Sequence, residues 1–223
     1  MAAEIEILKS ISYFSGLSTE ELNSITKFIS KKTTERGEII LLEGEPSVEV
    51  YFIVSGAVKL FKTSAEGKEQ ILNIVRQWES FGDVAVFDGA LNPAGAQAMV
   101  PTMLYSIRRN DIEAILREHP QVSRNVIQVL VSQVRHSMSL VEDLSFKHVI
   151  DRVAKILLEY AGDGSGNRPR LTQQEMAAMV GTAREMIGRS LKSLEEEGVI
   201  RLDRHRVVIT DNEALKELAG ANA

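Results

Sequence analysis

The chain has 223 residues, a formal net charge of −5 and no cysteine. That length can bury one large core or two smaller ones, and the missing cysteine excludes disulfides, thiolate zinc sites, cysteine-bound iron–sulfur clusters and cysteine nucleophiles for this chain. No apolar run approaches the roughly 20 residues that span a bilayer, and the N-terminus lacks the order of a secretion signal. We therefore expect a cytoplasmic protein with no membrane contact.

The negative charge is unevenly placed along the chain. Residues 1–146 hold 14 Lys and Arg against 19 Asp and Glu, whereas residues 147–223 hold 12 against 12. A nucleic-acid site is therefore expected late in the chain.

The first elements in chain order are helical. Ile5–Lys31 has helical spacing of apolar residues, and Ser18 with Glu21 forms a capping-box pattern. From Thr33 to Ile107 the pattern changes to short apolar runs separated by glycines, which is typical of an antiparallel barrel or sandwich. The expected strands are Glu38–Leu42, Val50–Val54, Val58–Phe61, Gln70–Val75 and Met103–Ile107.

A long helix is predicted next. Asn110 is the expected cap of a short helix at Asp111–Arg117, and Pro120 then begins a longer one. Along the longer helix one stripe recurs at alternating steps of four and three residues, the spacing of a coiled-coil seam between two chains. The competing interpretation is that this helix packs on the barrel of its own chain. We expect dimer contacts from Val126, Leu130, Gln133, Ser137, Leu140 and Leu144.

A helix-turn-helix pattern follows a further amphipathic helix at Val149–Tyr160 and a loop rich in glycine. Thr172 with Glu175 forms a capping box, and Gly181 supplies the positive φ of a tight turn. The second helix of the pair buries one stripe at steps of four and three, formed by Ile187, Leu191 and Leu194.

The opposite face of that second helix carries Arg184, Glu185 and Arg189. In a major groove an arginine can donate two hydrogen bonds to guanine, and a carboxylate can accept one from cytosine. A competing interpretation is a solvated face on which Glu185 and Arg189 form an ion pair. We expect DNA contacts from Thr172, Gln174, Thr182, Arg184, Glu185, Arg189, Lys192 and Arg204.

Two strands, Val199–Leu202 and Arg206–Thr210, are expected around a turn at Asp203–His205. A hairpin after a helix-turn-helix is the winged-helix arrangement. The basic residues in and beside this turn are candidates for contact with DNA phosphates: Arg201, Arg204, His205 and Arg206. The competing interpretation is that they are exposed basic residues without a function.

These residues resemble the cyclic-AMP receptor protein and FNR superfamily of bacterial transcription regulators. Gly181, Arg184, Glu185 and Arg189 match its pattern Gly-x-x-Arg-Glu-x-x-x-Arg, and the resemblance covers nearly the whole chain. It implies an α+β fold with an antiparallel β-roll that senses an effector (residues 1–119), a long dimerisation helix (120–145) and a winged helix-turn-helix (146–223). It also implies a homodimer, inverted-repeat half-sites close to TGTGA and contact with RNA polymerase.

The family's effector cassette has a counterpart in Phe81-Gly82-Asp83-Val84, which resembles the phosphate-cradling Phe-Gly-Glu-Leu. Cyclic-nucleotide binders add an Arg and a Ser or Thr for the cyclic phosphate, and residues 92–98 contain neither, which disfavours cyclic AMP. The effector stays unidentified, and none of the four histidines is nominated as a haem ligand. Trp78 stands where such proteins usually have a turn glycine. We expect the effector pocket to involve Phe81, Gly82, Asp83, Val84, Ser137 and Met138.

Two other functional classes compete with a regulator. A sensor or adaptor would use the late helices for protein contacts, and a salt titration of DNA affinity separates it from a DNA-binding protein. An enzyme would have to use Asp83 with Asp88, which lack a companion His, Lys or metal-ligand spacing. We expect no catalytic activity, and a hinge near Asp143–Phe146 that links the sensor to the DNA-binding helices.

Overall fold

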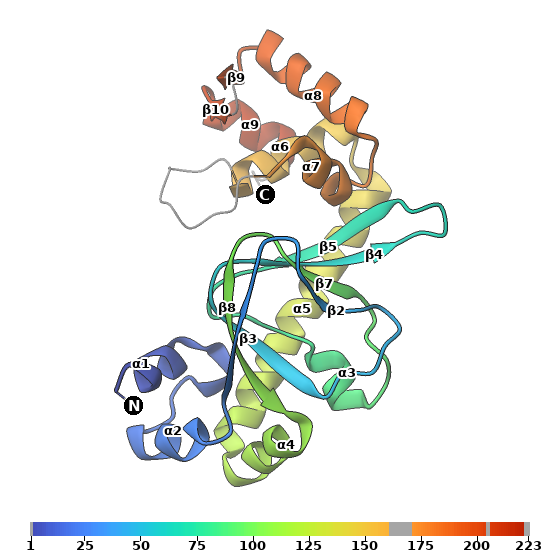
Figure 1. Ribbon diagram of the computed structural model, residues 1–223. Coiled ribbons are helices and arrows are strands. Elements are labelled where there is room, and N and C mark those ends of the chain that lie inside the picture. Colours follow the sequence, from blue (N-terminus) through green and yellow to red (C-terminus); the bar gives the residue numbers. More distant parts are fainter. Residues whose placement is uncertain (1, 161–170, 204–205, 221–223) are drawn as a thin grey trace. The chain divides into compact units, whose positions relative to one another are not determined.

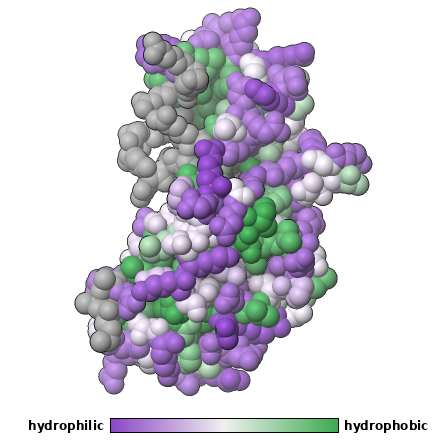
Figure 2. All heavy atoms as spheres, in the orientation of Figure 1, coloured by the Kyte–Doolittle hydropathy of each residue, from purple (hydrophilic) through white to green (hydrophobic). Residues whose placement is uncertain are grey.

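The computed structural model describes residues 2–160, 171–203 and 206–220, which form two compact units (Figure 1). The first unit comprises residues 1–62 and 72–137, and the second comprises residues 63–71 and 138–223. On the face drawn in Figure 2 hydrophilic residues predominate, and hydrophobic ones gather in a few patches. Among the described helices, none has the length and apolar character needed to cross a membrane.

Two four-stranded sheets with antiparallel pairing form the β-roll, in the orders β1-β8-β3-β6 and β2-β7-β4-β5. Their strands are β1 (Ser30–Thr34), β2 (Ile39–Leu41), β3 (Glu49–Ser55), β4 (Val58–Thr63), β5 (Glu69–Val75), β6 (Ser80–Phe81), β7 (Gly95–Ala98) and β8 (Thr102–Arg108). The five expected strands are confirmed, with ends that differ by one or two residues.

Strand β3 lies between two hydrophobic cores, which explains its continuous apolar run. Successive side chains of a strand point to opposite faces. Val50, Phe52 and Val54 accordingly pack against helices, whereas Tyr51 and Ile53 pack against the other sheet. A strand buried on both faces holds the two layers of the roll together.

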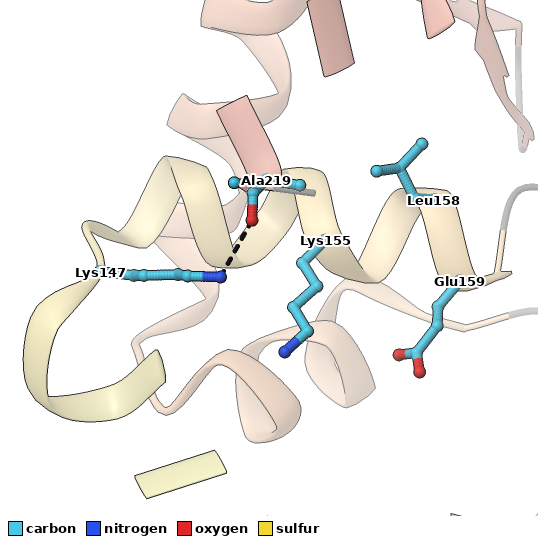
Figure 3. A pocket seen from close by; sticks show the side chains of 6 residues that line it. Lys147, Lys155, Leu158, Glu159 and Ala219 are labelled. Carbon is cyan, nitrogen blue, oxygen red and sulfur yellow. Dashed lines mark hydrogen bonds between the residues drawn. The ribbon is translucent and has the colours of Figure 1, made fainter. Parts of the chain in front are cut away.

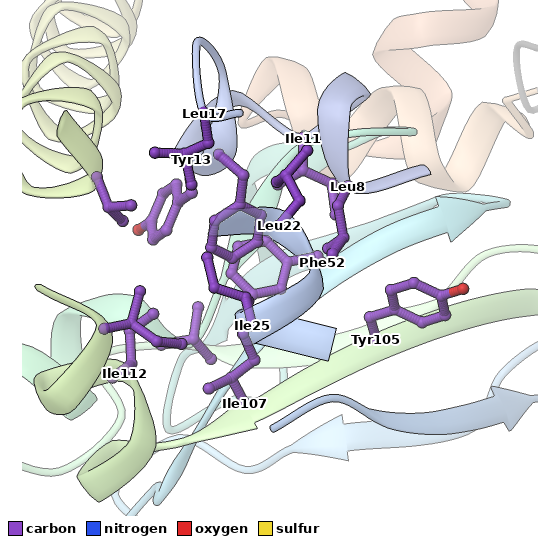
Figure 4. Packing of buried hydrophobic residues seen from close by; sticks show 14 of the residues in the cluster. Leu8, Ile11, Tyr13, Leu17, Leu22, Ile25, Phe52, Tyr105, Ile107 and Ile112 are labelled. Carbon is purple, nitrogen blue, oxygen red and sulfur yellow. The ribbon is translucent and has the colours of Figure 1, made fainter. Parts of the chain in front are cut away.

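Helices cover the outer face of the sheet that contains β3. They are α1 (Ala2–Ser10), the 3-10 helix η1 (Ser12–Phe14), α2 (Thr19–Thr26), α4 (Arg109–Glu118) and α5 (Pro120–Phe146). Figure 4 shows their apolar side chains around Phe52, whose ring centroid lies 5.2 Å from that of Tyr13 and 5.4 Å from that of Phe14. Ser18 and Glu21 make both hydrogen bonds of the expected capping box.

Two local expectations were wrong in this region. The helical lead-in ends at Thr26, and Ser30 already begins the edge strand β1, whose exposed polar residues carry no alternating apolar pattern. Asn110 lies inside α4 rather than before it, because the backbone passes directly from β8 into the helix and Arg108 occupies the cap position.

The second unit is a three-helix core with a hairpin and a final helix. Its elements are α6 (Val149–Tyr160), α7 (Gln173–Val180), α8 (Arg184–Glu196), β9 (Ile200–Asp203), β10 (Arg206–Ile209) and α9 (Asn212–Ala219). Apolar side chains from all four helices and from β9 form one buried cluster. The winged helix-turn-helix expected from the sequence is confirmed.

Candidate DNA-binding surface and effector cassette

The first helix of the pair, α7, begins with the expected capping box. The Thr172 backbone nitrogen lies 2.6 Å from Glu175 Oε2, and the Glu175 nitrogen lies 3.1 Å from Thr172 Oγ1. At the other end Gly181 has a φ of 73°, and its N–H and that of Thr182 both donate to the Ala177 carbonyl at 3.0 Å. Glycine adopts this left-handed conformation without a steric penalty, which is why the turn between the helices is tight.

The second helix, α8, is held by its apolar stripe. Ile187, Leu191 and Leu194 are at most 2% exposed and pack against α6 and α7 in the buried cluster. Its cap residue is Ala183, which has no side-chain acceptor for the first backbone N–H groups. These N–H groups, together with the positive end of the helix dipole, therefore remain available to a phosphate. The sequence reasoning missed this backbone feature, although an alanine at the cap position signals it.

The three side chains expected to read bases lie exposed at the start of α8. Within the described residues, no hydrogen bond or ion pair engages Arg184, Glu185 or Arg189. Glu185 and Arg189 in particular do not form the ion pair of the competing interpretation, although they stand four residues apart on the helix. Their charged groups are thus available to a ligand.

The other expected DNA contacts have different surroundings. Gln174 is exposed, Thr182 is half-buried in the turn, and Lys192 forms an ion pair of 3.5 Å with Glu196. Thr172 uses its hydroxyl oxygen as an acceptor for the helix cap. Arg204 lies outside the described residues, between the two strands of the wing.

The effector cassette is built around a buried carboxylate. Phe81 stacks on Tyr51 with ring centroids 5.1 Å apart, and Gly82 turns the chain with a φ of 79° into the short helix α3 (Asp83–Asp88). Asp83 is 3% exposed, and its Oδ1 accepts the Val84 N–H at 3.0 Å. The Val84 side chain itself is exposed.

Three side chains from three different elements donate to the same oxygen of Asp83. Tyr13 Oη lies 2.9 Å, Gln133 Nε2 3.2 Å and Ser80 Oγ 3.3 Å from Asp83 Oδ2. Burial, and next the nearby Asp83 charge, raise the pKa of the Tyr13 hydroxyl well above its usual value, so that the hydroxyl remains a donor. The cassette is thereby tied to the N-terminal segment and to α5.

Sequence reasoning missed Tyr13, Ser80 and Gln133 as members of this cluster. The structure gives Ser137 another role than a cassette contact, since its hydroxyl donates to the Gln133 carbonyl at 3.0 Å, and Met138 is exposed. A glutamine inside a mostly apolar stripe was the available signal, because a buried amide group needs a hydrogen-bond partner.

A turn just before the cassette contains the one described non-glycine residue with positive φ, Trp78 at 73°. The Glu79 N–H donates to the Arg76 carbonyl at 3.0 Å, which closes the turn, and the indole packs partly against the core. This conformation is the one that glycine adopts easily. Trp78 thus occupies a glycine-like position, as the sequence suggested.

The stripe expected to form the dimer seam faces the chain's own β-roll along its first half. Val126 is 6% exposed and belongs to the core of its own chain, so it is unavailable to a partner, and Leu130 packs partly against the same core. Because neighbouring residues of a helix differ by about 100° in direction, the next stripe points outward. Its side chains are between 48% and 68% exposed: Ile127, Val131, Val134, Met138 and Val141.

The junction between α5 and α6 lies slightly later than expected. Helix α5 continues through Phe146, and only Lys147 and His148 separate it from α6. Burial acts to raise the pKa of Asp143, but hydrogen bonds from Lys155 and Lys147 outweigh it and hold that pKa below its usual value.

Comparisons with known proteins agree with this geometry. The cyclic nucleotide-binding domain family matches residues 31–119, and the Crp-like helix-turn-helix domain family matches residues 151–218. The chain is 31% identical over 221 residues to the CRP-like cAMP-activated global transcriptional regulator of Mycobacterium tuberculosis, covering 96% of this chain and 99% of that protein. It is 32% identical over 212 residues to the cyclic AMP receptor protein of Thermus thermophilus, covering 95% and 98%.

Solved structures share the fold. A transcriptional regulator of the CRP/FNR family from Thermus thermophilus, TTHA1359, is 26% identical with a TM-score of 0.74, over 87% of this chain and all of that one. FixK2 from Bradyrhizobium japonicum is 24% identical with a TM-score of 0.77, over 87% and 99%.

The fold and the exposed start of α8 define a DNA-binding transcription regulator that joins a β-roll of the cyclic nucleotide-binding domain family to a winged helix-turn-helix. The chain belongs to the CRP/FNR family of transcription regulators.

Proposed function

We propose that this regulator binds, as a homodimer, inverted-repeat DNA with TGTGA-like half-sites, which it reads with Arg184, Glu185 and Arg189. The observation that carries the proposal is that these three charged groups stand together at the exposed start of α8 with no partner among the described residues. Two arginines match guanine and one carboxylate matches cytosine. The uncapped N–H groups of α8 add a phosphate contact that fixes the register.

The second subunit packs against the outward stripe of α5 in this proposal. The stripe from Ile127 to Val141 alternates steps of four and three residues, which is the seam of a two-stranded coiled coil. Two symmetric subunits then present their α8 helices to half-sites about 34 Å apart, one turn of DNA. Contact with RNA polymerase is proposed on the same family resemblance, and a transcription assay with purified polymerase tests it.

We assign effector sensing to residues 1–119, dimerisation to 120–145 and DNA binding to 146–223. Two relatives, from Mycobacterium tuberculosis and Thermus thermophilus, are described as cAMP-activated and as a cyclic AMP receptor protein. In this chain β7 and the preceding loop, residues 92–98, supply neither a cation nor a hydroxyl for a cyclic phosphate, and Ala96 and Ala98 are buried. The residues here therefore do not fit cyclic AMP, and we propose an effector without that phosphodiester.

In this proposal, effector binding is coupled to α5 through the hydrogen bond between Gln133 and Asp83. An effector that competes for Asp83 would release the glutamine from the cassette and change the packing of α5, so effector and DNA affinities should shift each other reciprocally. Effector binding that leaves DNA affinity unchanged would contradict this route.

DNA affinity measured by fluorescence anisotropy tests the function directly. The wild-type protein should prefer an inverted repeat of TGTGA over a scrambled duplex, and affinity should fall steeply with salt. Arg189→Ala should cost about 1–3 kcal/mol on the repeat and little on random DNA, because it removes a base contact. Arg204→Ala should weaken binding to both duplexes alike.

Lys216→Ala serves as the control, since it removes a positive charge from α9, outside the expected DNA contacts, where Lys216 pairs with Glu213 at 2.8 Å. It should leave the affinity for both duplexes unchanged. Equal losses on the repeat and on random DNA would remove Arg189 from the base-reading set. Binding that is weak and insensitive to salt would favour the competing adaptor function.

A further inference from the structure

One guanidinium connects the ends of two helices beside the recognition helix. Arg152, in the first turns of α6, donates from Nε to the Val180 carbonyl at 2.9 Å. Its Nη1 donates to the Asp143 carbonyl at 3.3 Å and to the Lys147 carbonyl at 2.5 Å. The same side chain thus contacts the end of α5 and the last residue of α7.

Both helix ends that Arg152 contacts, that of α5 and that of α7, favour a positive charge. The final carbonyls of a helix have no N–H donor within the helix and lie at the negative end of its dipole. A guanidinium has five donors in a rigid plane, so it can serve two directions at once, which an ammonium on a flexible chain does less well. Val180 immediately precedes Gly181, the turn into α8, so this bond acts on the start of the recognition helix.

Contacts of Lys147 and Lys155 also stabilise the junction between α5 and α6. Lys147 Nζ donates to the Ala219 carbonyl at the end of α9 at 2.9 Å (Figure 3) and lies 3.0 Å from Asp143 Oδ1. Lys155 also pairs with Asp143, and its Nζ lies 3.1 Å from Ser139 Oγ. The two-residue link between α5 and α6 is therefore held by polar contacts to α7 and α9.

We propose that Arg152 is a positioning residue for operator recognition: it fixes the direction of α8 relative to the end of α5 and so determines which spacing between half-sites the dimer accepts. The inference rests on the proposed function, because it requires two subunits that read two half-sites. Loss of the guanidinium would let the recognition helices adopt a wider range of separations. Spacing selectivity should fall more than affinity.

The experiment compares three duplexes that carry the same half-sites. In one the half-site centres lie one helical turn apart, and in the others a single base pair is inserted or removed at the centre. Wild-type protein should prefer the first duplex by about tenfold or more, and Arg152→Gln should reduce that preference to about threefold or less. Arg152→Lys should behave like Arg152→Gln, because a single ammonium group does not reach the Val180 carbonyl and the carbonyls at the end of α5 at the same time.

Arg117→Gln is the matched control, since it removes the same charge from an exposed position in α4 that makes no hydrogen bond or ion pair among the described residues. Its spacing preference should equal that of the wild type. Thermal unfolding of each variant shows whether the fold is retained, and the lysine variant provides the test if the glutamine variant does not fold.

An unchanged spacing ratio in folded Arg152 variants would overturn the proposal, even if their overall affinity falls. Full recovery of the ratio by lysine would also overturn it, since charge alone would then suffice. A wild-type protein that binds none of the three duplexes would instead refute the proposed function, and with it this inference.

Discussion

At the scale of single residues, the charges at the start of α8 could be located from sequence because helical geometry alone determines them. Residues three and four positions apart share a face of a helix, and the buried stripe of Ile187, Leu191 and Leu194 fixes which face is outward. The partners of Asp83 could not be found this way. Tyr13 and Gln133 stand 70 and 50 residues from it in sequence, and only the tertiary fold brings their donors to one oxygen.

Trp78 provides a residue-scale prediction about backbone strain. Both Trp78→Ala and Trp78→Gly remove the indole, but only glycine adopts a positive φ at no steric cost. The glycine variant should therefore be more stable than the alanine variant by about 1–2 kcal/mol in urea unfolding. At Met179, inside α7, the order should reverse, because glycine is the poorer helix former there.

An alanine variant at position 78 that equals or exceeds the glycine variant would show that this turn relaxes when the indole is removed. The difference between the two small residues is the informative quantity, since lost packing is common to both.

At the scale of elements, long periodic segments were predictable and short ones were not. The bounds of α6 and the capping boxes of α2 and α7 agree with the sequence, because each has a strong local signal. Strands β1, β6 and β7 and helix α3 were missed. Strand β1 reads Ser-Lys-Lys-Thr-Thr without an apolar alternation, and β6 has only two residues, so their pairing partners rather than their own composition define them.

The position of the seam on α5 illustrates the same limit. Two neighbouring stripes of this helix both show steps of four and three, and sequence spacing does not say which one the β-roll covers. The stripe that contains Val126 and Leu130 packs on its own chain, and the outward stripe is the one on which we propose the dimer seam. Only the burial of Val126 and the exposure of Ile127 distinguish them.

Helix α5 leads to a prediction about self-association. Val134→Glu places a charge in the middle of the outward stripe, so the dimer should dissociate and affinity for the inverted repeat should fall. Sedimentation velocity measures the change in mass. Ser132→Glu, on an exposed position of the same helix about 160° around its axis from the stripe's Val134, should leave the dimer intact.

Dissociation in both variants would mean that the charge acts nonspecifically on the helix. A dimer that survives Val134→Glu would place the interface on another surface.

At the scale of the whole molecule, the described residues form separate hydrophobic cores. One buried cluster joins the N-terminal helices to β3 and β8, another lies between the sheets, and a third belongs wholly to residues 149–219. The charge distribution already indicated this division, since the negative excess lies in the first part and the second part is balanced. The winged helix-turn-helix and the β-roll are therefore held by different sets of packed residues.

The two units, with their separate cores, should unfold in separate transitions. Leu194→Ala opens a cavity in the cluster of residues 149–219 and should cost that unit about 2–5 kcal/mol. Calorimetry should show one transition at a lower temperature and the other unchanged, because separate units need not unfold together. A single transition that shifts as a whole would show that the two units unfold cooperatively.

The turn at Trp78 has a practical consequence for finding the effector. This indole is the chain's single tryptophan, half-buried and only five positions before Asp83, so its ultraviolet emission reports on the surroundings of Asp83 without a label. A compound library could be screened on native protein by the wavelength and intensity of the tryptophan fluorescence.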